Sequence, residues 1–126
     1  MSKDVEDLVR RWREDAAEDM QLARDILNKG KHRHAMFFAH LALEKALKAL
    51  VMRATGKAAP KIHNLPELAA RTAVSFDEER MKFLAAMNFY QLAGRYLNSR
   101  DGRVDADLAT QNFRKAEKLF EWLINL

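Results

Sequence analysis

The sequence predicts an all-α protein, an up-and-down four-helix bundle with one additional short helix. Only four glycines and two prolines occur among its 126 residues, so few positions would interrupt a long helix. Apolar residues recur at spacings of three and four over long stretches, which is the period of an amphipathic helix. No segment between turns alternates polar and apolar residues as a strand does. With no linker in the chain, we expect one domain over residues 1–126.

The first two helices are expected to form a hairpin. The first is predicted over residues 4–28, where apolar residues form one stripe. Asn28-Lys29-Gly30 ends it, because glycine takes the left-handed conformation of a helix C-terminus at no steric cost. The second helix is predicted over residues 33–54, before Thr55-Gly56. A basic loop, residues 56–62, follows it.

The third helix is expected to be short, over residues 65–73. Asn64 is a typical N-cap residue, and Pro66 and Glu67 suit the first turn of a helix.

The fourth and fifth helices are expected to complete the bundle. The fourth begins at Ser75 or Asp77, both cap-like residues, and runs to Asn98, with Met87 or Asn88 on its inner side. A turn at residues 100–102 precedes the last helix, which runs from Asp105 to the C-terminus. Four long helices joined by short connections favour an up-and-down bundle.

The composition excludes several classes of protein. There is no cysteine, so neither a disulfide nor a thiolate zinc site is possible. The N-terminus is charged from its third residue and resembles no signal peptide, and no apolar run approaches the ~20 residues of a membrane span. His32 and His34 point to different sides of a helix, and no third ligand follows at a suitable spacing. We therefore expect a cytoplasmic protein with no membrane contact, no metal and no cofactor.

Positive charge is concentrated in one third of the chain. Residues 31–63 carry seven basic residues against one acid, Glu44, within a formal net charge of +4. All four histidines lie in the same segment. Such an excess attracts phosphate or an acidic partner, although a solvated helix face with a basic loop would give the same composition. The basic residues are Lys31, Arg33, Lys45, Lys48, Arg53, Lys57 and Lys61.

The second helix carries a polar stripe that a core helix would not be expected to have. His40, Glu44 and Lys48 follow one another at i,i+4, on the side opposite the main apolar face. Phe37 and Leu41 lie on that same side, so the face is mixed. Mixed apolar and charged faces are typical of interfaces, and we predict a dimer interface of Phe37, Leu41, Glu44 and Lys48. The alternative is a pocket with Glu44 and Lys48 as its polar groups.

Three stretches of the chain carry motifs typical of one family of small helical proteins. Residues 35–50, AMFFAHLALEKALKAL, resemble that family's second helix with its Glu-Lys-x-Leu-Lys motif. Residues 63–69, HNLPELA, begin with His63 and resemble the start of its short third helix. Residues 90–96, from Tyr90 to Tyr96, are similar to its Tyr-x4-Arg-Tyr stretch, although Leu97 and Asn98 follow here where a proline and an acid are common. The chain thus resembles the HEPN family, which is named for its occurrence in higher eukaryotes and prokaryotes and its proposed nucleotide binding.

The resemblance implies a helical bundle that dimerises and binds a nucleotide or RNA. It also implies a gene-neighbour partner, a minimal nucleotidyltransferase, in a toxin–antitoxin-like pair. Some family members are metal-independent ribonucleases in which four to six residues separate an arginine from a histidine. After Arg95 the corresponding positions hold Arg100, Asp101 and Gly102. Arg33 and His40 have the required spacing, but at the start of the second helix, away from the place of that site.

Two hypotheses for function follow. The first is a non-catalytic HEPN-like module that binds nucleotide or RNA phosphate, or a nucleotidyltransferase-type partner. The second is a ribonuclease, for which Arg95 and His40 are the candidate catalytic residues, since cleavage without a metal needs a proton acceptor and a cation near the phosphate.

We place the predicted phosphate site at one end of the bundle. In an up-and-down arrangement the start of the second helix meets the end of the fourth, which gathers cations and a tyrosine that can stack on a base. His63, in contrast, is expected to orient its loop by hydrogen bonding. The predicted nucleotide-binding residues are Arg33, His34, Arg95, Tyr96 and Arg100.

Overall fold

The computed structural model describes residues 2–95 and 104–126, which contain five helices and no strand. The all-α fold predicted from the sequence is confirmed. The helices are α1 (Lys3–Asn28), α2 (His32–Thr55), α3 (Leu65–Ala70), α4 (Glu78–Arg95) and α5 (Ala106–Ile124).

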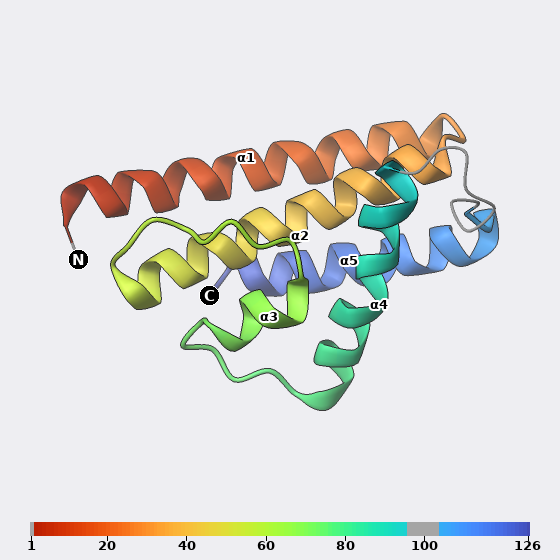
Figure 1. Ribbon diagram of the computed structural model, residues 1–126. Coiled ribbons are helices and arrows are strands. Elements are labelled where there is room, and N and C mark those ends of the chain that lie inside the picture. The colour runs from red at the N-terminus through yellow and green to blue at the C-terminus, as the bar shows by residue number, and fades with distance from the viewer. Residues whose placement is uncertain (1, 96–103) are drawn as a thin grey trace.

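Helix α2 is the centre of the bundle. The other four helices all pack against it, and α1 does so along most of its length. In Figure 1, the axes of α1, α2 and α5 are roughly aligned, with the chain of α1 running opposite to those of α2 and α5, while α4 crosses them steeply. The crossing brings the last turns of α4 beside the N-terminal half of α2.

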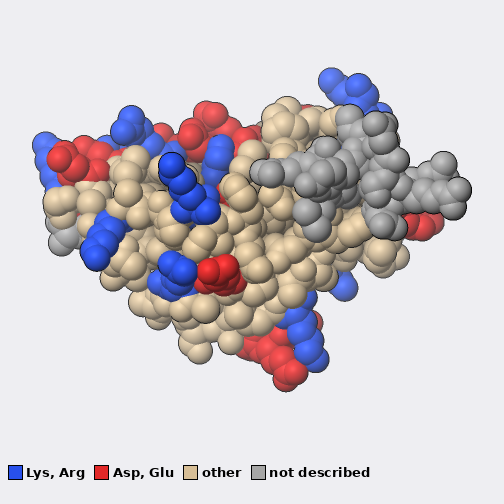
Figure 2. Space-filling model, in the orientation of Figure 1, with Lys and Arg blue, Asp and Glu red and all other residues tan. Residues whose placement is uncertain are grey.

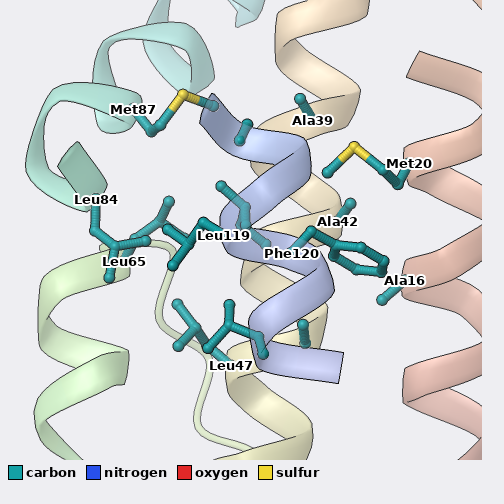
Figure 3. Packing of buried hydrophobic residues seen from close by; sticks show 14 of the residues in the cluster. Ala16, Met20, Ala39, Ala42, Leu47, Leu65, Leu84, Met87, Leu119 and Phe120 are labelled. Atoms are coloured by element: carbon teal, nitrogen blue, oxygen red, sulfur yellow. The ribbon is translucent and has the colours of Figure 1, made fainter. Parts of the chain in front are cut away.

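The core contains apolar residues of all five helices, and α2 contributes several of its largest side chains, among them Met36, Leu43 and Leu47. Figure 3 shows Phe120 of α5 between α2 and α1, where Ala16 and Ala42 leave room for its ring. On the other side of α5, Leu119 reaches toward Leu65 of α3 and Leu84 of α4. Such a core depends on filling space without voids, because interiors pack as densely as organic crystals.

The N-termini of four helices are fixed by side-chain caps. Ser2, Asn64 and Asp105 accept backbone hydrogen bonds at the starts of α1, α3 and α5, and Asp77 Oδ1 accepts one from Arg80 N at 2.9 Å at the start of α4. Of the two predicted starts of the fourth helix, Asp77 is therefore the cap. Side-chain caps satisfy N–H groups that have no partner within the helix.

Three helix ends follow from local chemistry. Gly30 and Gly56 have φ of 78° and 69°, the left-handed conformation in which glycine ends α1 and α2. Helix α3 ends at Ala70, three residues before its predicted end. The hydroxyl of Thr72 donates to Ala69 O at 2.8 Å and accepts from Val74 N at 3.2 Å, so it competes with the continuation of the helix.

The predicted end of the fourth helix at Asn98, and the turn at residues 100–102, lie outside the described residues. Across the described ranges, no helix combines the length and apolar character that crossing a bilayer requires.

Candidate functional site

The polar stripe of α2 lies inside the protomer, where it forms a hydrogen-bonded network. Glu44 and Lys48 are each 5% exposed and His40 is 1% exposed. Lys48 Nζ donates to Glu44 Oε2 at 3.1 Å. His63 Nδ1, from the loop before α3, lies 3.1 Å from Glu44 Oε1. One carboxylate therefore joins a buried lysine to a loop histidine 19 residues further along the chain.

His40 and Asn88 continue this network into α3 and α4. His40 Nε2 lies 3.3 Å from Asn88 Oδ1, and the same oxygen accepts from Leu65 N at 3.1 Å. Burial lowers the pKa of His40 below its ordinary value of 6.5, against the opposing effects of Asn88 and Glu44. A neutral His40 that donates from Nε2 satisfies Asn88 Oδ1.

The predicted dimer interface needs correction at Glu44 and Lys48. Both side chains are covered by the same chain, because the loop of His63 lies over Glu44 and the ring of Trp12 in α1 lies 5.7 Å from Lys48 Nζ. Helical periodicity places Glu44 and Lys48 on a side of α2 other than its main apolar face. It carries no information that α1, α4 and the loop of His63 cover that side.

Phe37 and Leu41 remain half-buried within the protomer. Their contact with a second copy stays a prediction.

The position of His40 also bears on the proposed ribonuclease chemistry. Arg33 Nη2 lies 3.5 Å from His34 Nε2, near the start of α2, while His40 is seven residues beyond Arg33, about 10 Å by helical rise. A general base must reach the proton it abstracts, and His40 is enclosed at 1% exposure. The two residues with nuclease-like spacing are therefore not brought together.

The N-terminus of α2 differs from those of the other described helices. Within the described part of the chain, no side chain caps it and its first turn has no acidic residue. Its first residues are instead cationic or titratable: Lys31 and His34 are exposed, and His32 and Arg33 are half-buried. Free N–H groups and the helix dipole favour an anion at such an end.

The remaining predicted site residues fall into two groups. The side chains of Arg95, Tyr96 and Arg100 lie outside the described residues. Tyr90, from the family-like stretch, is 4% exposed, and Asn112 Nδ2 of α5 donates to its hydroxyl at 2.8 Å. Tyr90 therefore joins α4 to α5 inside the bundle.

Two residues of the network have no role predicted from the sequence. Helical spacing places Met87 or Asn88 on the inner side of the fourth helix but indicates no partner for Asn88. Trp12 belongs to the apolar stripe of the first helix, and its spacing indicates no contact with Lys48. Neither residue has a local sequence signal for its contact, because Asn88 meets His40 across 48 positions. Among the described residues, no three histidine or acidic side chains are arranged to hold a metal ion.

Comparison with known proteins gives two similarities. The model of the HEPN domain family matches residues 9–126. The crystal structure of TT1696 from Thermus thermophilus is similar with a TM-score of 0.76 and 22% identity, over 91% of this chain and 94% of that one. At this identity the likeness shows a shared fold. No curated protein matches the chain.

Proposed function

This chain belongs to the HEPN domain family, and from that premise we propose that it is a homodimeric, non-catalytic module that binds the phosphate of a nucleotide or RNA at the N-terminus of α2. The observation that carries the proposal is the uncapped start of this helix, with Lys31, Arg33 and His34 beside it. The N-termini of the other described helices are already satisfied by Ser2, Asn64, Asp77 and Asp105.

The chemistry at this end suits a phosphate monoester or diester. Backbone N–H groups donate along the helix axis, while a guanidinium can form two parallel hydrogen bonds to phosphate oxygens. The last described turns of α4 lie beside the N-terminal half of α2 in Figure 1, and the contribution of Arg95, Tyr96 and Arg100 rests on the sequence pattern alone.

An uncharged surface supports the homodimer. In the view of Figure 2, few charged side chains lie over the middle of α4, whereas its first turn carries acidic and basic groups. Phe89 of α4 is 43% exposed. Together with the half-buried Phe37 and Leu41, it offers apolar area to a second copy.

The proposed partner is a minimal nucleotidyltransferase in a toxin–antitoxin-like pair. Its support is family membership alone. Copurification of the product of an adjacent gene, coexpressed with this chain, would test it.

Phosphate binding is tested by the fluorescence anisotropy of a labelled single-stranded RNA and of a labelled adenine nucleotide. The combined Arg33→Ala and His34→Ala variant should weaken binding roughly tenfold and reduce the dependence of affinity on salt. The matched control is Arg71→Ala with Arg114→Ala, which removes two exposed cations elsewhere and should have a smaller effect. Equal losses in the two variants would refute a site at α2.

Two further measurements accompany this test. No cleavage of the RNA is expected, and turnover abolished by Arg95→Ala would contradict the non-catalytic assignment. Light scattering should give about 29 kDa, twice the 14.6 kDa of the chain; a species of monomer mass at micromolar concentration would contradict the dimer.

A further inference from the structure

A groove lies between α4 and α5, and none of the residues of the α2 network lines it. Both helices pack against α2, and the space between them has a volume of about 630 Å³. The lining residues on α5 extend from Asn112 to Trp122, which corresponds to about 15 Å of helix, or roughly three turns.

The floor of the groove is apolar. Phe83 of α4 and Trp122 of α5 are half-buried, and Leu119 between them is 6% exposed. Phe76 packs its edge against the ring of Trp122, with centroids 5.5 Å apart and planes at 79°. An apolar floor of this kind binds side chains by excluding water.

Cations line both rims. Lys82 lies on the α4 rim, and Lys115 and Lys118 lie on the α5 rim, all three exposed. Lys82 pairs with Glu78 at 3.0 Å, but both side chains are more than three-quarters exposed, so the pair is weak. Within the described ranges, Lys115 and Lys118 form no ion pair. The rims therefore offer positive charge to an incoming partner.

We propose that this groove binds an acidic amphipathic helix of a partner protein, an interaction that goes beyond the proposed phosphate site and does not depend on it. Apolar side chains at i, i+3 or i+4, and i+7 of such a helix would occupy the floor. Acidic side chains on its flanks would face Lys82 on one rim and Lys115 and Lys118 on the other. Three turns of helix match the length of the groove.

The groove suits a protein helix better than a nucleic acid. Binding of single strands relies on free aromatic faces on which bases stack, and here the guanidinium of Arg80 covers the ring of Trp122 at 4.0 Å from its centroid while Phe76 contacts the same ring. Asp77 and Glu79 line one end of the groove, where they disfavour phosphates and carboxylates alike, so the acidic side chains of the partner helix are expected beside Lys82, Lys115 and Lys118.

Selection from a phage-displayed library of helical peptides of about three turns tests the proposal. Selection on the wild-type protein is followed by counterselection on Ala86→Trp, which fills the groove from an exposed position of α4. Ala85→Trp is the matched control, since Ala85 is also exposed but does not line the groove. Enriched peptides should carry spaced apolar residues flanked by Asp and Glu, and should bind the Ala85→Trp variant but not the Ala86→Trp variant.

Charge reversal then tests the rims with a selected peptide. Lys115→Glu with Lys118→Glu should weaken binding roughly tenfold or more, and a peptide with lysine in place of its acids should bind this variant better than the wild type. The control is Lys57→Glu with Lys61→Glu, which changes the net charge equally at exposed positions outside the groove. Circular dichroism and thermal unfolding establish that each variant is folded.

Four results would overturn the proposal. One is the absence of any peptide whose binding is lost in Ala86→Trp, and another is the enrichment of peptides without acidic residues. The third is a single-stranded RNA that displaces the peptide from the wild type and does not bind the Ala86→Trp variant. The groove would then be a nucleic-acid site. The last is a wild-type dimer that Ala86→Trp, but not Ala85→Trp, converts to a monomer, because a second copy would then fill the groove.

Discussion

The buried pair Glu44–Lys48 gives the sharpest test of the network in α2. We consider Glu44→Leu, Lys48→Met and the double variant. Replacing Glu44 removes the only carboxylate within 4 Å of Lys48 Nζ among the described residues, and it leaves an ammonium group whose side chain is 7% exposed. Burial of a charge without a partner is costly, because the protein interior does not replace the lost hydration.

The size of the effect follows from this burial. Removing one member of a buried ion pair costs about 3–5 kcal/mol. The cation–π contact between Lys48 Nζ and the ring of Trp12, 5.7 Å apart, is present in both the wild type and Glu44→Leu and leaves this difference unchanged. The lost bond to His63 adds little, because the side chain of His63 is 50% exposed and is readily hydrated. We expect Glu44→Leu to lower the free energy of unfolding by about 3 kcal/mol.

The double variant should behave differently from either single one. Replacing both members of a buried pair by apolar residues of similar volume is often neutral or stabilising, so Glu44→Leu with Lys48→Met should lie within about 1 kcal/mol of the wild type. Urea unfolding followed by far-ultraviolet circular dichroism measures all four proteins. A decrease in the free energy of unfolding of less than about 1 kcal/mol in Glu44→Leu would refute the proposed cost of an unpaired, buried Lys48. A double variant no more stable than the single variants would refute it as well.

Two further predictions concern the same network. Burial lowers the pKa of His40 below 6.5, so at mildly acidic pH the unfolded chain binds more protons at this residue than the folded chain does. The contribution of His40 to the free energy of unfolding therefore falls as the pH drops below about 6.5, and it becomes constant below the pKa of His40 in the folded chain. Urea unfolding across that pH range gives the slope of the free energy of unfolding against pH. His40→Gln should reduce this slope, whereas His34→Gln, an exposed control, should leave it unchanged. If His40→Gln also leaves it unchanged, His40 is not the source of the pH dependence. Asn88→Ala should lower the free energy of unfolding by about 2 kcal/mol, since it leaves Leu65 N and His40 Nε2 without an acceptor. Asn125→Ala, an exposed control, should change it by less than about 0.5 kcal/mol, and equal effects would contradict a structural role of Asn88.

The sequence determined the features that depend on neighbours along the chain. Helix positions follow from apolar spacing, and most of their ends lie within a residue or two of the prediction. Asn64 caps α3 because its side-chain oxygen accepts a backbone hydrogen bond. Gly56 ends α2 in the left-handed conformation, which glycine adopts readily because it has no Cβ. The one clear difference, the early end of α3, comes from the hydroxyl of Thr72, whose hydrogen bonds compete with the helix ladder.

Only the tertiary structure decided what the polar stripe of α2 does. Helical spacing places His40, Glu44 and Lys48 on one line, and on that information we predict an interface, with a pocket as the alternative. The choice depends on which segments cover the line. Trp12 of α1 covers Lys48, and Asn88 of α4 meets His40 across 48 positions; separations of this size carry no periodic signal. Packing of α1, α4 and the loop of His63 around α2 is set by the shape of the whole core, and that packing brings the stripe into one buried hydrogen-bonded network.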